Sequence, residues 1–289
     1  MIKKGIILAG GYGTRLGSLT KAVNKQLLPL YDKPLIYYPL SVLMLSGIRE
    51  VLIIVNKGQI NQFKKILPSG ENLGIKISYA EQTYPKGLPD AFQIGKNFIG
   101  KDGVVLILGD NFFYGQSLGL KLKESTKLKS GAKVFLHKVS KPELYGVAKI
   151  NKNKKIIKIV EKPKKFVSDY AITGLYFFDN KVIKLAKTLK PSKRGETEII
   201  DLLNKYKNEK KLKADFIGRG GAWLDTGSIK DFYNTSTFVS TIENRQGMKI
   251  ACLEEIAFYN KWIKRKEVQN SIKFYGNCDY SNYLKKIIG

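Results

Sequence analysis

Near its beginning the chain reads Gly5-Ile-Ile-Leu-Ala-Gly-Gly-Tyr-Gly-Thr-Arg-Leu16, a short apolar run that passes directly into a glycine-rich turn. Similar apolar runs recur at residues 51–55, 75–79 and 104–108, and the stretches between them have the spacing of helices. Strands that alternate with helices in this way predict an α/β fold. Because the runs are continuous, both faces of each strand should be buried, as in a mostly parallel, Rossmann-like sheet sandwiched by helices.

The pattern changes from residue 132 onward. Strand-like segments follow closely at residues 134–139, 146–150, 156–160 and 170–178, and residues 151–155 resemble a hairpin turn in which asparagine supplies the positive φ. We expect helices at 181–189 and 196–206, a strand at 214–217 and a mainly helical region from 228. Without a linker or an internal repeat, the sequence predicts a single domain over residues 1–289, in parts of about 1–131, 132–227 and 228–289.

The composition is that of a folded protein with a strongly basic surface. Hydrophobic residues make up 43% and charged residues 26%, and the formal net charge is +27. Such a charge attracts nucleic acid and anionic membranes. The lysines, however, are scattered, and no RNA-binding or helix-turn-helix signature accompanies them. We therefore expect a solvated lysine surface with no nucleic-acid partner, although its field would favour a small, phosphate-rich substrate.

Cysteine usage and hydropathy indicate a cytoplasmic protein. Only Cys252 and Cys278 are present, without the spacing of metal ligands and with too few partners for a disulfide framework. The longest apolar runs have about five residues, whereas a membrane span needs roughly twenty. We expect no membrane association, and we interpret the first residues as a strand and not as a signal peptide.

The glycine-rich turn is a candidate phosphate cradle, because glycines let successive backbone N–H groups approach an anion. Two familiar motifs do not fit: Gly13 is followed by Thr14-Arg15 where a P-loop needs Lys-Ser/Thr, and Leu16 occupies the position of the third glycine of a dinucleotide fingerprint. A plain tight turn is the alternative. Arg15, with Lys25 one short segment later, favours anion binding because an arginine fork suits phosphate.

At this point a family resemblance becomes specific. The motifs Gly10-Gly-Tyr-Gly-Thr-Arg-Leu16, Asn24-Lys-Gln-Leu-Leu-Pro29 and Asp32-Lys-Pro-Leu-Ile-Tyr-Tyr-Pro-Leu40 resemble the opening signature of the sugar nucleotidyltransferases, or nucleotide-sugar pyrophosphorylases. The match continues through Gln82, Gly87-Leu88, Leu108-Gly-Asp-Asn111, Tyr145-Gly-Val147, Val160-Glu-Lys-Pro163, Thr173-Gly-Leu-Tyr176, Arg194-Gly-Glu-Thr-Glu-Ile199 and Ala222-Trp-Leu-Asp-Thr-Gly227. It covers essentially the whole chain. Departures from the usual pattern fall in loops, at Ser18, Lys86, Pro89-Asp90 and Gly221.

The resemblance implies a nucleotide-binding first part and a sugar-binding second part. The implied nucleotide-binding residues are Leu8, Gly10, Gly11, Gly13, Thr14, Arg15, Lys25, Gln26, Gln82 and Gly87. The implied sugar-phosphate-binding residues are Asn111, Tyr145, Gly146, Glu161, Lys162, Thr173, Gly174 and Trp223. Arg15, Lys162 and Asp110 are the candidate catalytic residues. The resemblance implies that Lys162 binds the phosphate of the sugar phosphate and that Glu161 contacts the sugar hydroxyls. Surface charges at a strand end are the alternative interpretation of Glu161-Lys162.

An acid directly after a buried strand, Asp110, is a candidate ligand for Mg²⁺, which takes only one or two protein carboxylates plus substrate phosphates. The alternative is an aspartate that caps the next turn. The resemblance supplies Asp225 as the second metal ligand and implies Mg²⁺ as the cofactor.

Within the family, the thymidylyltransferases that use dTTP and glucose 1-phosphate are the most similar. The implied products are dTDP-glucose and pyrophosphate; a uridylyl- or cytidylyltransferase is the alternative, and a basic nucleic-acid-binding protein is the remote one. The resemblance also implies a homotetramer and a second nucleotide site, with Gly115, Arg219 and Glu255 as candidates, at which an end product such as dTDP-rhamnose inhibits.

Overall fold

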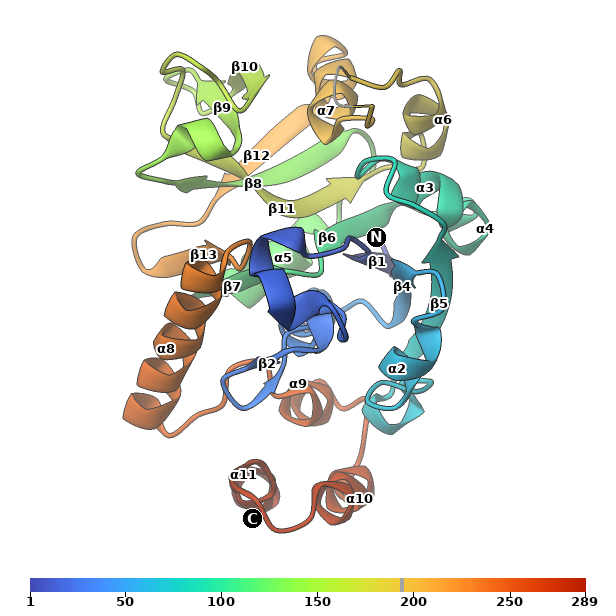
Figure 1. The fold of residues 1–289 in the computed structure, drawn as a ribbon, viewed down its shortest axis with the longest axis vertical. Helices are drawn as coiled ribbons and strands as arrows, with labels where there is room; N and C mark the ends of the chain where they lie inside the picture. Colours follow the sequence, from blue (N-terminus) through green and yellow to red (C-terminus); the bar gives the residue numbers. More distant parts are fainter. Residues whose placement is uncertain (193–194) are drawn as a thin grey trace.

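The fold is a mixed, mostly parallel sheet between layers of helices. The structure, a computed structural model, describes residues 1–192 and 195–289, and within them nine strands form one sheet. Its strands run β10-β9-β11-β6-β1-β4-β5, while β8 pairs with β11 and with β12 (Figure 1). The strands are β1 Lys4–Ala9, β4 Glu50–Asn56, β5 Lys76–Gln82, β6 Val104–Leu108, β8 Ala132–Lys138, β9 Gly146–Ile150, β10 Ile156–Glu161, β11 Tyr170–Phe178 and β12 Leu212–Phe216. The expected fold class is confirmed.

Strands β1, β4 and β6 are buried on both faces, as their continuous apolar runs predict, whereas the edge strand β5 is only partly buried. Strand β1 pairs in parallel with β4 and β6, and β4 pairs in parallel with β5. Successive side chains point to opposite faces, so Ile6 and Leu52 belong to one core cluster, whereas Ile7 and Ile53 belong to the other. All of these side chains are at most 4% exposed.

The second half makes the sheet mixed. Strand β11 runs antiparallel to β6 and β8, and β9 and β10 form the expected hairpin. The expectation that an asparagine supplies the positive φ of this turn is wrong, because the residue with the left-handed backbone is Lys154, with φ 57. Asn151 instead accepts hydrogen bonds from the backbone N–H groups of Asn153 and Lys155 through its side chain, at 3.0 and 2.9 Å. The turn therefore depends on a side-chain acceptor.

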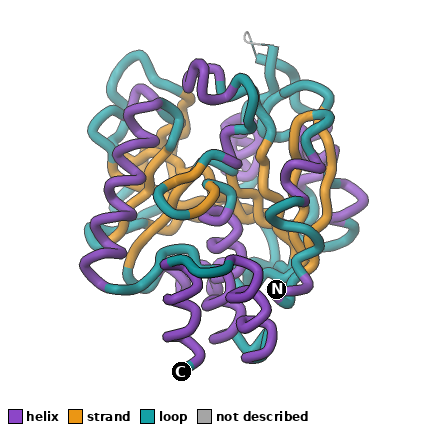
Figure 2. Tube along the Cα trace, turned by 60° about the horizontal axis from the view of Figure 1, so that its bottom comes forward, coloured by secondary structure: helices purple, strands orange, loops and turns teal. Residues whose placement is uncertain are grey.

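Helices cover both faces and form the C-terminal region (Figures 1 and 2). They are α1 Tyr37–Leu45, α2 Ile60–Lys64, α3 Asp90–Ile94, α4 Lys96–Ile99, α5 Leu118–Ser125, α6 Val182–Lys187, α7 Ile199–Asn208, α8 Ile229–Gln246, α9 Leu253–Tyr259, α10 Arg265–Tyr275 and α11 Asp279–Ile288. The helical region from residue 228 is confirmed. Helix α7 begins three residues later than expected, because Glu198 has an extended backbone (φ −98, ψ 136) and occupies the N-cap position of the helix, and β12 begins two residues earlier.

Two small ribbons lie outside the main sheet. Strands β2 Pro29–Leu30 and β3 Lys33–Pro34 form one. Strands β7 Asn111–Gly115 and β13 Gly221–Asp225 form the other, in antiparallel register, with Asp225 opposite Asn111. The second ribbon brings an acid from far along the chain beside the end of β6.

Gly131, just before β8, offers a test of this packing. Its φ is +92, and a Cβ there would lie 2.2 Å from the carbonyl oxygen of Lys211. We predict that Gly131→Ala lowers the free energy of unfolding by about 1–3 kcal/mol, measured by urea denaturation. Gly218→Ala is the control, because its Cβ would meet no atom within 4 Å, and equal stabilities of the two variants would contradict the prediction.

Candidate active site

Two adjoining cavities lie at the carboxyl ends of β1 and β6, where ligands of such sheets bind. The larger has a volume of about 320 Å³ and the smaller about 240 Å³, and they share Gly10, Arg15 and Asp110. The larger is lined by Leu8, Gln82, Gly87, Asn111, Tyr145, Gly146, Glu161, Lys162, Gly174, Trp223 and Asp225. The smaller is lined by Gly11, Gly13, Thr14, Lys25 and Gln26. The structure thus brings together every candidate nucleotide-binding residue and all but one of the candidate sugar-phosphate residues.

The glycine turn forms one wall of both cavities. Gly11 and Gly13 have φ of +118 and +59, values that glycine adopts without strain. A Cβ on Gly10 would lie 1.8 Å from the Gln82 amide nitrogen, so glycine is required for that contact. The Asn56 side chain accepts from the Gly11 N–H and donates to its carbonyl, both at 3.0 Å. Sequence reasoning missed Asn56: the sequence shows a polar residue at the end of a buried strand, but its contact with Gly11 is visible only in the structure.

Asp110 lies at the junction of the cavities, and Asp225 lines the larger one. Lys25, 5% exposed, donates to Asp110 Oδ2 at 2.8 Å, and the Asn111 amide donates to Oδ1 at 3.0 Å. Burial raises the pKa of Asp110, but the Lys25 charge and these hydrogen bonds outweigh it and hold that pKa below its usual value. Burial, together with the charge of Asp110, raises the pKa of Asp225 to about 6. The pair therefore carries unequal affinities for protons.

These carboxylates fit a magnesium ion. In residues 1–192 and 195–289 no cluster of three or more His, Cys, Asp or Glu side chains could hold a metal without help. Mg²⁺ commonly takes only one or two carboxylates and completes its shell with water and phosphate oxygens. Burial and, after it, the negative charge of Asp110 raise the pKa of Asp225, and a cation bound beside both carboxylates would favour their ionised forms.

Asn111, 2% exposed, is held from three sides. Its Oδ1 accepts from the Gly174 N–H at 3.0 Å and from the Trp223 indole N–H at 2.6 Å, while its amide nitrogen donates to Asp110. Both polar ends of this side chain are therefore used within the protein. Asn111 lines the larger cavity but its main effect is to orient Asp110.

Glu161 and Lys162 face the same cavity although they are neighbours. Adjacent residues of a regular strand would point to opposite faces. Strand β10 ends at Glu161, and Lys162 adopts φ 41, with its backbone N–H donating to the Tyr145 carbonyl at 3.0 Å. The left-handed residue reverses the alternation, so an acid and a base both line the cavity.

Thr173 is the candidate that lies elsewhere. It is 0% exposed, and its hydroxyl donates to the Phe135 carbonyl at 3.1 Å. The residues on either side of it in β11, Ile172 and Gly174, line the cavity together with Tyr176. Side chains alternate between the two faces of a strand, which explains why Thr173 faces away from the cavity. The same alternation, counted from Gly174, predicts that Ile172 and Tyr176 face it.

Other lining residues were not assigned to the site from the sequence, although several of them stand in the motifs quoted above. They are apolar residues and members of the segment before α7, namely Pro85, Leu88, Leu108, Leu144, Glu196, Thr197, Glu198, Ile199 and Ile200. The Thr197 N–H donates to the Lys86 carbonyl at 2.8 Å, and a Cβ on Gly87 would lie 2.0 Å from the Thr197 carbonyl oxygen. Arg194, the first residue of the motif quoted above, lies outside the described residues.

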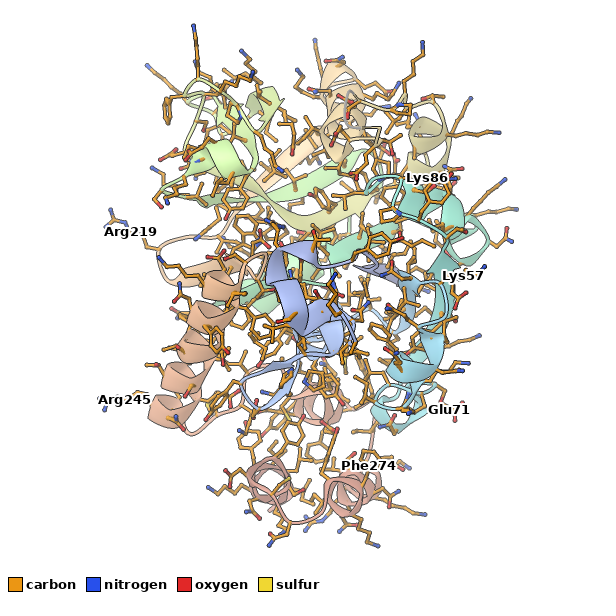
Figure 3. All side chains as sticks on the ribbon, viewed as in Figure 1. Lys57, Glu71, Lys86, Arg219, Arg245 and Phe274 are labelled. Carbon is orange, nitrogen blue, oxygen red and sulfur yellow. The ribbon has the colours of Figure 1, made fainter. Side chains whose placement is uncertain are left out.

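The candidates for a second nucleotide site are only partly brought together. Gly115 and Glu255 line one cavity of about 420 Å³ between β7 and α9. Arg219 does not line it; its neighbours Gly218 and Gly220 line an adjacent cavity with Gly115. Figure 3 shows the Arg219 side chain pointing outward from the molecule.

None of the helices in the described ranges is long and apolar enough to cross a bilayer.

The chain belongs to the nucleotidyl transferase family, whose model matches residues 4–242. More particularly, it groups with the relatives called glucose-1-phosphate thymidylyltransferase. The Neisseria meningitidis relative of that name is 49% identical over 99% of each chain. The Mycobacterium tuberculosis one is 44% identical, again over 99% of each.

Solved structures agree with this assignment. A Bacillus anthracis protein described as a glucose-1-phosphate thymidylyltransferase, in complex with sucrose, is 40% identical with a TM-score of 0.75, over 81% of this chain and 94% of that one. A UDP-glucose pyrophosphorylase complexed with UDP-glucose is 27% identical with a TM-score of 0.73, over 84% of this chain and 100% of that one. The protein is therefore an enzyme of the nucleotidyltransferase class.

The raised pKa of Asp225 predicts a pH-dependent cost in the metal-free protein. The pKa of this carboxyl group rises to about 6 on folding. The group therefore stabilises the folded state at pH values below its pKa in the unfolded chain, and this contribution is lost as the pH rises through 6. Asp225→Asn removes the ionisation, so the variant should melt at a higher temperature than the parent at pH 8 in EDTA, and the difference should shrink towards pH 4. A constant difference over this range would contradict the assigned cause.

Proposed function

We propose that the protein transfers a thymidylyl group from dTTP to α-D-glucose 1-phosphate, giving dTDP-glucose and pyrophosphate. One observation carries the proposal: the glycine-rich turn and two aspartates line the same pair of adjoining cavities as Glu161 and Lys162. The names of the relatives support the same two substrates. The nucleotide would occupy the glycine-turn side and the sugar phosphate the Glu161 side.

The reaction needs positioning and charge neutralisation more than proton transfer. A sugar-phosphate oxygen forms a bond to the α-phosphorus while the bond from that phosphorus to the pyrophosphate oxygen breaks, in line with the attack. The attacking phosphate monoester is already a dianion, so it requires no general base. The only histidine, His137, agrees with this: its Nδ1 lies 3.3 Å from the Ile217 carbonyl oxygen, and the residue lines neither cavity.

The cations of the site have separate tasks in this proposal. Arg15 lines both cavities, and its guanidinium lies so close to Gly227 that a Cβ there would be 2.8 Å from one of its nitrogens. Arg15, together with Lys25, would stabilise the charge that develops on the departing pyrophosphate. Lys162 would orient the attacking phosphate, while Glu161 accepts hydrogen bonds from sugar hydroxyls.

Asp110 and Asp225 would hold Mg²⁺, whose positive charge would neutralise the phosphate oxygens of both substrates. Lys25 already places one positive charge on Asp110 at 2.8 Å. Asn111 keeps the other oxygen of Asp110 in a fixed direction. The chain itself thus prepares the carboxylate geometry, and the ion would add a second charge beside Asp225.

Thymine recognition is assigned to two glutamines. Gln82, 6% exposed, lies on the larger cavity, and Gln26, 5% exposed, on the smaller. Among buried side-chain atoms of the described ranges, Gln26 Oε1 is the one without a hydrogen-bond partner. A buried carbonyl of this kind costs stability unless a ligand donates to it, which supports a role in nucleotide binding.

The proposed reaction is tested by pyrophosphate release from a panel of dTTP, UTP, dCTP, ATP and GTP with glucose 1-phosphate and Mg²⁺. We expect dTTP to give the highest kcat/KM, UTP to be weaker and purine triphosphates to be poor. A higher kcat/KM with UTP or dCTP would assign the enzyme to the uridylyl- or cytidylyltransferases instead. Equal use of all five would contradict base recognition by Gln26 and Gln82.

We further propose a homotetramer with an effector site that binds the end product. Its support is the cavity of about 420 Å³ that contains Gly115 and Glu255, distant in sequence from the glycine turn. The outward direction of Arg219 (Figure 3) would suit a contact with a ligand or a neighbouring subunit at the cavity rim.

Lys162→Ala should keep the fold and lose turnover, because a cation aimed at a reacting phosphate stabilises the transition state. We expect kcat to fall by about a hundredfold to a thousandfold, with an unchanged melting temperature. The matched control is Lys164→Ala, since Lys164 is exposed and lines neither cavity. Near-parental kcat in Lys162→Ala would remove this residue from the mechanism.

Asp110→Asn should weaken the Mg²⁺ dependence, because a neutral amide replaces a charged ligand poorly. We expect the Mg²⁺ concentration for half-maximal activity to rise by about tenfold or more, by analogy with hydrogen bonds to charged groups, which contribute about 1.5–3 kcal/mol. Asp102→Asn is the control, as that carboxylate pairs with Lys4 at 2.9 Å. A parental Mg²⁺ titration in Asp110→Asn would show that Asp110 is not a ligand.

A further inference from the structure

Asn56, which ends β4, has an amide whose orientation is fixed by the backbone of the glycine turn. The Gly11 N–H donates to Asn56 Oδ1 at 3.0 Å, and Asn56 Nδ2 donates to the Gly11 carbonyl at 3.0 Å. A backbone N–H can only donate and a carbonyl can only accept. Exchanging the oxygen and nitrogen of Asn56 would therefore break both bonds, so Oδ1 has one possible place.

The same oxygen fixes the direction of Gln82. The Gln82 amide nitrogen donates to Asn56 Oδ1 at 3.2 Å. Because Oδ1 carries only lone pairs, the NH₂ end of Gln82 must face it and the carbonyl end must face away. Gln82 is 6% exposed and packs over Gly10, where a Cβ would lie 1.8 Å from its amide nitrogen. The amide is thus confined as well as oriented.

We infer that Asn56 is a positioning residue that sets base selectivity through Gln82. The inference rests on the proposed function and deepens it. No side chain or backbone group in the described ranges donates to Gln82 Oε1, and Gln82 lines the larger cavity. Oriented by Asn56, Gln82 offers a base one acceptor, Oε1, and the second hydrogen of its amide nitrogen as a donor.

This pattern selects one class of pyrimidine edge. Thymine and uracil present an N3–H donor beside a carbonyl acceptor, which match an acceptor and a donor in that order. Cytosine presents the reverse, an N3 acceptor beside an amino donor. Its N3 would then face the Gln82 carbonyl oxygen, acceptor against acceptor, and its amino group would face the Gln82 NH₂ group, donor against donor. A flipped Gln82 would suit cytosine, and Asn56 opposes the flip because its oxygen would then meet the Gln82 carbonyl.

The test compares dTTP with dCTP in the parent, Asn56→Ala and Asn56→Asp. The two nucleotides share the sugar, the triphosphate and the ring size, so the ratio of their kcat/KM values cancels any general damage to the glycine turn. In Asn56→Ala the ratio of dTTP to dCTP should fall by about tenfold or more, the cost of leaving one buried polar group unpaired. Asn56→Leu, which also lacks the acceptor, replaces it if the alanine variant does not fold.

Asn56→Asp is the matched control, because its carboxylate still accepts from the Gln82 amide nitrogen. It should keep the parental ratio of kcat/KM values. It loses the donation to the Gly11 carbonyl, which should lower kcat/KM for both nucleotides by the same factor. In a Gln82→Leu background, Asn56→Ala should change the ratio no further. A parental ratio in Asn56→Ala and Asn56→Leu, or an equal fall in Asn56→Asp, would overturn the inference.

Calorimetric binding of dTMP and dCMP separates this inference from the transfer reaction. An enzyme that prefers dTMP but releases no pyrophosphate with glucose 1-phosphate would contradict the proposed reaction, and the binding ratio in the Asn56 variants would still decide the role of Asn56. A parent that binds dTMP and dCMP equally would overturn both the base assignment and the role of Asn56.

Discussion

The ion pair between Lys25 and Asp110 is the interaction on which the candidate active site depends. It is 2.8 Å long, with side-chain exposures of 6% and 25%, and it stands where the two cavities meet. Without Lys25, Asp110 and Asp225 would be two partly buried like charges, an arrangement that raises the pKa of one of them. With Lys25 present, Asp110 keeps a lowered pKa and Asp225 takes the increase. Asp110 therefore loses its proton more readily than Asp225 does.

The sheet supplies the means of assembling this site. Strands β1 and β6 are parallel neighbours, so their carboxyl ends deliver the glycine turn and Asp110 to the same edge. The β7–β13 ribbon then adds Asp225 and Trp223 from more than a hundred residues later. This arrangement explains why the position of the site was predictable from apolar runs alone, whereas the identity of its sugar-side residues needed the family resemblance.

The points that the sequence alone does not explain have local physical causes. Thr173 was grouped with Gly174, but neighbours in a strand face opposite ways, and the Thr173 hydroxyl bonds to β8. The joint orientation of Glu161 and Lys162 depends on a left-handed residue, which no propensity for lysine would indicate. Asn56 escaped notice because its role arises from a contact with Gly11 across two strands. Features that depend on strand period were predictable, and features that depend on a single unusual φ or a cross-strand side-chain contact were not.

The C-terminal helices contribute to the site through a second buried group of charges. Lys33, in the ribbon that follows the Lys25–Gln26 segment, donates to Glu243 of α8 at 3.0 Å, and Lys249 donates to the other oxygen of Glu243 at 3.0 Å. Buried charges are costly unless paired, and Lys33 and Glu243 are only 4% and 5% exposed. Their pairing therefore holds the β2–β3 ribbon against α8. Because this ribbon directly follows the segment Lys25–Leu27, it also restrains that segment. A helix outside both cavities thus restrains the segment on which the Lys25–Asp110 ion pair depends.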